Sequence, residues 1–415
     1  MSPKPRILLI GTADTKSPEL AFLKERILEC GGEVVFMDIS VLARGTLKAE
    51  ISNEAVAAAA KSTLQEIAAL GDENAAMAKM AEGAAALASE RHAGGWIDGM
   101  LALGGTMGTD LALDVASALP LGVPKFVIST IAYSHLIPPE RVAPDLMMIL
   151  WAGGLYGLND ICRSLLAQAA GAVVGASRAG RRPSNARPLI GMTSLGKSCL
   201  RYMEYLLPAL ETRGYDVAVF HTTGMGGRAF EHLAAAGAFA AVMDFSLQEL
   251  ANHCAGSIVT AGADRLEGAG RRGVPQLVAP GAIDMIDFPA WRDNPWSGDG
   301  RNYHTHNRLI ASVAATGEER REVARRIAQK LTLAKGPTVY LIPCQGIEAW
   351  DREGEPMHAP EALAAFLDET RRLSLGPARR IEIDAHINDA AFAEAALDVF
   401  DAWVRESHVE KGRAI

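Results

Sequence analysis

Small polar residues and one lysine follow the first predicted strand, in the segment Gly11–Glu19 with the sequence GTADTKSPE. Glycine permits a tight turn, and Thr12 and Thr15 offer hydroxyl groups. Asp14 could hold a metal ion or a ribose hydroxyl, and Lys16 could neutralise a phosphate just before a helix begins. The same residues suit an ordinary strand-to-helix turn, so this segment alone does not define a binding site.

A glycine-rich turn follows the third predicted strand, where residues 101–112 read LALGGTMGTDLA. Glycine at this density lets backbone N–H groups converge on an anion, although the turn does not match the pattern GxGxxG. The second predicted strand ends in Asp38, about where a Rossmann unit places its ribose-binding acid, and the fourth ends in Ser129 and Thr130. Four strand ends therefore carry residues suited to a nucleotide. The candidates in the glycine-rich turn are Gly104, Gly105, Thr106, Gly108 and Thr109.

A second phosphate site is suggested by residues 191–198, GMTSLGKS, which match the P-loop pattern GxxxxGK followed by Ser or Thr. The pattern predicts a strand before this segment and a helix that opens at its end, with Gly196, Lys197 and Ser198 around the phosphate. Asp244, near the end of a later predicted strand, is then the available magnesium acid. The alternative is an ordinary turn in which Lys197 only marks the start of a helix.

Acids and imidazoles also occupy predicted turns in the second half of the chain. The glycines and arginine of residues 224–228 resemble another anion-binding turn. His304 and His306 lie two apart, so on a strand they face the same side, as metal ligands require. Structural hydrogen bonding at strand ends is an equally good interpretation of His221 and His386. The catalytic candidates are His221, Asp284, His306, Asp384 and His386.

Short β-branched runs alternate with longer helical patterns along the chain, which predicts βα units and mainly parallel sheets. We expect an α/β fold with two Rossmann-like domains whose sheets are flanked by helices. Expected strands lie at 6–11, 34–39, 100–104, 125–129 and 145–151, then at 189–193, 217–221, 241–245, 276–279, 339–343 and 381–385. Expected helices in the first half lie at 18–29, 54–70, 74–91 and 159–174.

The arginine- and proline-containing segment around residues 177–188 lacks apolar periodicity, which marks a domain boundary. A chain of 415 residues is long enough for two or three domains. We therefore predict an N-terminal nucleotide-binding domain at 1–178, a linker at 179–187 and a C-terminal domain at 188–415.

The charge balance, 41 Lys and Arg against 49 Asp and Glu, leaves a net charge of -8, the opposite of what a nucleic-acid-binding surface needs. The five cysteines lie far apart without a CxxC pair, which disfavours a zinc cluster and a disulfide framework. The first apolar run is cut by a glycine, and the uncharged stretch 146–158 is too short to span a membrane. We expect a cytoplasmic protein that binds small molecules rather than nucleic acid or membrane.

Seven segments in order along the chain resemble the Tm-one-like ATP-binding family. They read GTADTKSPELAFLKE, VVFMDIS, LGGTMGTDLA, LPLGVPKFVIST, FHTTGMGGRAFE, VAPGAIDMIDF and DAHINDAAFAEA, and the resemblance covers nearly the whole chain. It implies a two-domain α/β protein, usually a homodimer, whose N-terminal domain binds ATP with magnesium. The ATP-binding residues implied are Thr12, Asp14, Thr15, Lys16, Asp38, Gly104, Gly105, Thr106, Gly108, Thr109, Ser129 and Thr130, and Asp14 is the implied magnesium ligand.

The sequence departs from the family pattern at several positions. Gly154 stands where the family has an aspartate, Ala314 and Gln345 stand where it has arginines, and Glu348 replaces a serine. Each lost guanidinium removes a bidentate partner for a carboxylate or phosphate, so we expect the second domain to prefer a less anionic ligand than typical members do.

The first interpretation is an ATP-binding protein that transfers a phosphoryl group to a small metabolite or activates one. Two alternatives stay open. One is a nucleotide-dependent binding or regulatory module without turnover, and the other is a small-molecule hydrolase or lyase that uses the second domain.

Overall fold

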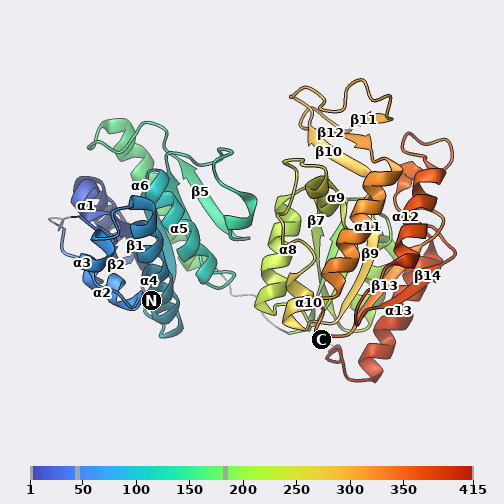
Figure 1. Ribbon diagram of the computed structural model, residues 1–415. Coiled ribbons are helices and arrows are strands. Elements are labelled where there is room, and N and C mark those ends of the chain that lie inside the picture. The colour runs from blue at the N-terminus through green and yellow to red at the C-terminus, as the bar shows by residue number, and fades with distance from the viewer. Residues whose placement is uncertain (1–2, 43–46, 181–185, 414–415) are drawn as a thin grey trace. The chain divides into compact units, whose positions relative to one another are not determined.

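The computed structural model describes residues 3–42, 47–180 and 186–413. The chain divides into two compact units, Met1–Pro183 and Ser184–Ile415, each with its own parallel sheet (Figure 1). Of the predicted linker, residues 181–185 lie outside the described residues. Within the described part of the chain, no helix combines the length and the apolar composition needed to cross a membrane.

The first unit contains a five-stranded parallel sheet in the order β2-β1-β3-β4-β5, with helices on both faces. Its strands are β1 (Arg6–Gly11), β2 (Glu33–Asp38), β3 (Gly99–Gly104), β4 (Lys125–Ser129) and β5 (Leu146–Leu150). Helices α1 (Ala13–Glu29) and α6 (Asp160–Ala179) cover one face. The opposite face carries α2 (Asn53–Ala59), α3 (Leu64–Ala68), α4 (Glu73–Ala93) and α5 (Thr106–Ala118), and a 3-10 turn, η1, spans Pro139–Arg141.

Residues 7–10 of strand β1 are all apolar because their side chains alternate between two cores. Ile7 and Leu9 belong to the core shared with α1 and α6. Leu8 and Ile10 belong to the core shared with the helices of the opposite face. A strand covered on both faces has no polar side, so a continuous apolar run is the expected signature of a parallel strand.

The second unit contains a six-stranded parallel sheet in the order β14-β13-β9-β8-β6-β7. Its strands are β6 (Leu189–Ser194), β7 (Asp216–His221), β8 (Ala241–Ser246), β9 (Gln276–Gly281), β13 (Thr338–Pro343) and β14 (Arg379–Ile383). One face carries α7 (Met203–Thr212) and α13 (Ala390–Arg405). The other carries α8 (Met225–Ala236), α9 (Gln248–Cys254), α10 (Gly268–Arg272), α11 (Gly317–Leu331) and α12 (Pro360–Arg372), and η2 spans Ala349–Asp351.

A small antiparallel sheet interrupts the second unit between β9 and α11 (Figure 1). It consists of β10 (Met285–Pro289), β12 (Ile310–Ala314) and β11 (Tyr303–Thr305), in that order. The N–H of Ala315 donates to the carbonyl of Asp284 at 2.7 Å, so this excursion leaves and returns at one point. These three short strands are not among those expected from the sequence.

The predicted α/β class with two mainly parallel, helix-flanked sheets is confirmed, and the ends of the expected strands differ by at most two residues. Three details of the prediction are wrong. The helix expected at 54–70 is two short helices, and the helix expected at 18–29 begins at Ala13 with a non-helical backbone at Lys16. His304, one of the imidazoles expected in a turn, lies in β11, and β10 follows Asp284 directly.

Candidate functional site

The carboxyl edge of the first sheet has a topological switch point between β1 and β3. The chain passes from β1 to β2 on one side and then to β3 on the other. Helices α1 and α5 therefore begin next to each other but run along opposite faces of the sheet. In open α/β sheets this divergence leaves a crevice, which is where ligands bind.

A cavity of about 570 Å³ lies at this switch point. Its walls come from the turns after β1 and β3, from the segment after β2, and from α4 with the turn before it. The size falls in the usual range for small-molecule sites. The lining residues are Thr12, Asp14, Thr15, Lys16, Ile39, Val41, Leu42, Ala68, Gly71, Asp72, Glu73, Ala76, Met77, Leu103, Gly104, Gly105, Thr106, Met107 and Gly108.

The glycine-rich turn has two different steric requirements. A Cβ on Gly104 would lie 2.6 Å from the Cα of Gly108, so the backbone of the turn can close only over a glycine. A Cβ on Gly105 would meet only Oγ1 of Thr130, at 3.9 Å, so the space above Gly105 is open. Gly105 is also the N-cap of α5 and supplies no side-chain cap. The first amides of α5 are thus left to a ligand or to solvent.

The turn after β1 is held in place by the neighbouring strand. Oδ1 of Asp38 accepts a hydrogen bond from the N–H of Ala13 at 3.1 Å, and Oγ of Ser40 accepts one from the N–H of Asp14 at 3.1 Å. Asp38 is buried and does not line the cavity, so it positions the turn. Oδ1 of Asp14 is itself buried without a hydrogen-bond partner.

Lys16 is directed by the segment that follows β5. Its backbone departs from helical geometry, with φ -128° and ψ 22°. Its ammonium group hydrogen-bonds the carbonyl of Leu155 and lies 5.0 Å from the centre of the Tyr156 ring. Lys16 lines the cavity, while its ammonium group is held by two residues that are not among the lining residues.

The remaining candidates of the first unit lie behind the cavity wall. Thr109 is fully buried, with its Oγ1 2.7 Å from Oγ of Ser129, and that hydroxyl also accepts from the N–H of Ile131. Thr130 is half-buried beside Gly105. These hydroxyls support the glycine-rich turn.

The P-loop-like segment does not have the predicted geometry. Its first residues complete β6, but α7 begins only at Met203, so the helix expected to open at Ser198 is wrong. Lys197 is exposed, and Gly196 has a positive φ of 78°. A P-loop needs its lysine at a helix start, where the amides converge on phosphate, and this segment lacks that arrangement.

The second glycine-rich turn already holds an anion. Glu249 accepts hydrogen bonds from the N–H groups of Gly224 and Gly227, at 2.6 and 3.0 Å. A Cβ on Gly227 would lie 1.6 Å from a Glu249 oxygen. The turn that resembles an anion site thus binds a carboxylate of the protein itself, close to the amino end of α8.

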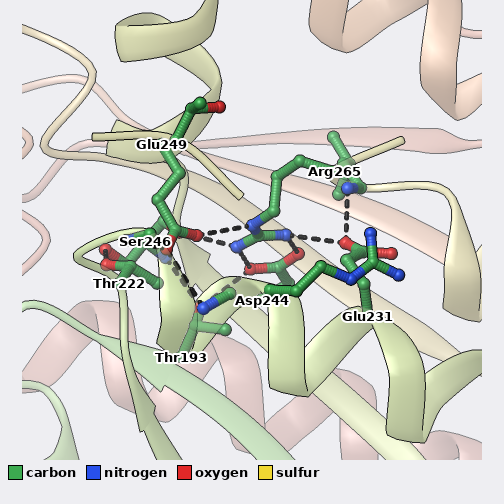
Figure 2. A network of polar contacts seen from close by, with 12 residues as sticks. Thr193, Thr222, Glu231, Asp244, Ser246, Glu249 and Arg265 are labelled. Carbon is green, nitrogen blue, oxygen red and sulfur yellow. Dashed lines mark hydrogen bonds and ion pairs between the residues drawn. The ribbon is translucent and has the colours of Figure 1, made fainter. Parts of the chain in front are cut away.

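Figure 2 shows that this carboxylate belongs to a buried network around Arg265. The guanidinium forms ion pairs with Asp244, Glu231 and Glu249, at 2.5, 3.0 and 3.0 Å. All four side chains are at most 3% exposed. Asp244 is therefore engaged by Arg265 and is not an available magnesium acid. Burial raises the pKa of Glu249 to about 7, although Arg265 opposes the rise.

A second buried cluster contains two of the catalytic candidates. Nε2 of His386 lies 3.0 Å from Oδ1 of Asp351, and Nδ1 accepts from the N–H of Asn388. Both oxygens of Asp284 and Oε1 of Glu348 are buried without a hydrogen-bond partner. Burial raises the pKa of Asp284 to about 7 and that of Glu348 to about 10. These carboxyl groups hold protons that exposed carboxyls would release.

The remaining catalytic candidates lie at different places in the second unit. Asp384 is exposed and accepts a hydrogen bond from Gln345 at 2.8 Å. His221 and His306 both line a small cavity of the second unit, together with Gln248, Asp287 and Ser312. Among the described residues, no three His, Cys, Asp or Glu side chains gather as a metal site, so the pair His304 and His306 lacks a third ligand. Gln248 and Ser312 were not singled out from sequence, since only the fold brings them to this cavity.

These features define an α/β protein with two Rossmann-like units and a ligand-sized crevice at the switch point of the first. The chain belongs to the family described as "Uncharacterised protein family (UPF0261)", whose N-terminal domain matches residues 5–182 and whose C-terminal domain matches residues 187–404. It is 58% identical to a UPF0261 protein of Brucella melitensis over 98% of each chain. It is 29% identical to the ToMV resistance protein Tm-1 of Solanum lycopersicum, over 99% of this chain and 57% of that protein. A solved UDP-N-acetylglucosamine 2-epimerase covers 67% of this chain and 79% of its own, with 12% identity and a TM-score of 0.21, which is too low to carry an argument.

Proposed function

We propose that the first unit binds ATP together with Mg²⁺ in the 570 Å³ cavity at the switch point. The observation that carries the proposal is the open amino end of α5 on a cavity that Lys16 also lines; the first two amides of α1 are already bonded to Asp38 and Ser40. Backbone amides and a positive helix end favour phosphate oxygens. Lys16 lines the same cavity, and its ammonium group is proposed to exchange the Leu155 carbonyl for a phosphate oxygen when the nucleotide binds.

The lining of the cavity includes groups that suit phosphates and groups that suit a base. The phosphates are expected over Gly105, Thr106 and Gly108, whose amides and hydroxyl act as donors. The apolar wall formed by Ile39 and Met77, together with Val41 and Ala76, suits a purine base. A cavity lined by both kinds of group is more specific than a simple anion site.

Asp14 is the residue proposed to hold magnesium. Its Oδ1 is buried on the cavity wall without a hydrogen-bond partner, and an unpaired buried carboxylate oxygen is stabilised by a cation. Asp14 would hold the ion, which would supply positive charge to offset that of the phosphates. Asp38 fits a positioning role for the turn, since its Oδ1 already holds Ala13.

We propose ATP-dependent phosphoryl transfer to a small metabolite, or its activation, as the reaction. The second unit has its own candidate acid and base groups, His221 and His306, which share a cavity of that unit. A module that binds nucleotide without turnover has the same first unit, so turnover must be measured. A hydrolase or lyase that acts in the second unit alone is favoured by the same two imidazoles.

The test is calorimetric titration of the full-length protein with ATP, ADP and AMP, with and without Mg²⁺. We expect ATP to bind more tightly than ADP or AMP. We also expect its full affinity only when Mg²⁺ is present. Absence of binding by every nucleotide would contradict the proposal. Release of ADP or phosphate in the presence of a panel of small metabolites would then separate an enzyme from a binding module.

A further inference from the structure

A second, smaller cavity lies at the carboxyl edge of the six-stranded sheet. Here too the chain changes direction, because β6 lies between β7 and β8 in the sheet. The antiparallel sheet packs over this edge, since Asp287 of β10 and Ser312 of β12 line the same cavity as His221, which ends β7. The volume is about 40 Å³, enough for a few water molecules. It can take one functional group of a ligand while the rest lies outside.

The floor of the cavity is a buried carboxylate with fixed partners. Asp287 and Ser312 lie directly opposite each other in the antiparallel register, and Oγ of Ser312 donates to Oδ1 of Asp287 at 2.6 Å. Asp287 is only 2% exposed, and burial raises its pKa to about 6. The hydrogen bond from Ser312 lowers the pKa in turn, and Oδ1 of Asn252 accepts a hydrogen bond from the N–H of Asp287 at 2.7 Å.

Gln248 leaves one strong acceptor unused at this floor. Its side chain is 1% exposed and also lines the cavity. An amide beside the Asp287 carboxylate presents its NH₂ end to that anion, so the carbonyl end is directed away from it. That atom, Oε1, is buried without a hydrogen-bond partner. An unpaired buried carbonyl costs free energy, which a donor from a ligand would recover.

Two imidazoles, and no guanidinium group, are among the residues that line this cavity. His221 and His306 are exposed at the mouth, and partial burial of the His221 ring and the nearby His306 lower the pKa of His221. A carboxylate or phosphate head group would offer no hydrogen to Gln248 and would approach the Asp287 carboxylate. A hydroxyl group offers the hydrogen and carries no charge.

We propose that this recess binds the hydroxyl group of a neutral, hydroxylated small molecule, with Oε1 of Gln248 as the acceptor. Gln248 accepts the hydroxyl hydrogen, and the neighbouring Asp287 carboxylate favours this orientation of the amide. The rest of the ligand extends past His221 and His306 to solvent. This site is independent of nucleotide binding in the first unit, so either proposal can fail alone.

The experiment uses the full-length protein with glycerol, ribitol and myo-inositol as neutral probes and glycerate and glycerol phosphate as anionic ones. Binding is followed by thermal shift and by ligand-observed NMR. We expect the neutral probes to bind and the anionic probes to bind at least about tenfold more weakly. Binding by the anions alone, or by no probe, overturns the proposal.

Gln248→Met keeps the side-chain volume but removes the acceptor, and it is expected to weaken the neutral probes about tenfold or more. Gln248→Asn shortens the side chain by one methylene group and keeps the amide, so it is less disruptive to folding. It should also weaken binding of the neutral probes. The control is Gln276→Met, a glutamine 2% exposed at the amino end of β9, which should leave binding unchanged. Equal binding by the parent and both Gln248 variants overturns the proposal.

Discussion

Oδ1 of Asp38, at the end of β2, accepts a hydrogen bond from the N–H of Ala13, the first residue of α1, at 3.1 Å. The carboxylate thereby acts as an N-cap supplied from another strand. A helix whose first amide is held in this way begins at one defined residue, next to the proposed phosphates.

Asp38→Ala should lower the free energy of unfolding by about 1 to 2 kcal/mol, because it removes this cap. Asp38→Asn retains a neutral acceptor and should lose less. Both variants are measured by urea denaturation and by ATP titration. If Asp38→Asn binds ATP as the parent does, a positioning role holds. If it loses binding with unchanged stability, Asp38 contacts the nucleotide directly.

Replacement of Gly105 by Val should abolish ATP binding and leave the fold intact. The space above Gly105 is open, so the new side chain enters the cavity rather than the protein. Gly104→Ala is the comparison, because its Cβ would lie 2.6 Å from the Gly108 backbone and should destabilise the unit. Calorimetry and circular dichroism distinguish the two effects. Unchanged affinity in Gly105→Val would remove this turn from the site.

Two lysines test which segment binds phosphate. Lys16→Ala should weaken ATP binding by about 1 to 3 kcal/mol, as expected for loss of a charged hydrogen bond. Lys197→Ala should change it little, because Lys197 is exposed and α7 begins only at Met203. Calorimetric titration of the two variants side by side is the measurement. The opposite ranking would assign the phosphate to residues 191–198.

Arg265→Met should destabilise the second unit by about 3 to 5 kcal/mol, since it leaves three buried carboxylates without their cation. Acidification should restore part of the loss, because protonation removes those charges. The control is Asp264→Asn, which breaks the ion pair with Arg228. Since Asp264 is 52% exposed, the expected change is below about 1 kcal/mol. If both variants lost a similar free energy of unfolding, the buried network would not contribute more than an exposed ion pair.

The carboxyl pair Asp284 and Glu348 should make the protein less stable as the pH rises. Burial raises both pKa values above the usual 3.8 and 4.5, to about 7 and about 10. The folded state thus keeps protons that the unfolded state releases above about pH 4, so this stabilisation is full in acid and is lost toward pH 10.

In Glu348→Gln, the fall in the free energy of unfolding between pH 5 and 9 should be smaller by at least about 1.4 kcal/mol, the equivalent of one pKa unit. Exposed Glu353→Gln is the control and should follow the parent curve. Denaturant unfolding at several pH values measures both. Parallel curves for the parent and Glu348→Gln would contradict the assigned protonation.

The parallel strands could be predicted because a strand covered on both faces reads as an apolar run. The strand Tyr303–Thr305 could not, because three residues carry too little pattern and its partner β12 follows an irregular segment. The two glycine-rich turns look alike in sequence. Only the fold places Glu249 against residues 224–227 and leaves residues 104–108 beside a cavity. The role of Gln248 likewise depends on contacts with Asp287, which is distant in sequence.

The excursion that carries β10, β11 and β12 begins at Asp284 and returns at Ala315, which are joined by one backbone hydrogen bond. The parallel sheet resumes with α11 and β13 as though the intervening residues were absent. Because the segment begins and ends at one place, its replacement is expected to leave the order of the parallel strands unchanged. Selectivity of the second unit can then diversify while its folding pattern stays constant, and grafting the segment between homologues becomes a practical route to altered ligand preference.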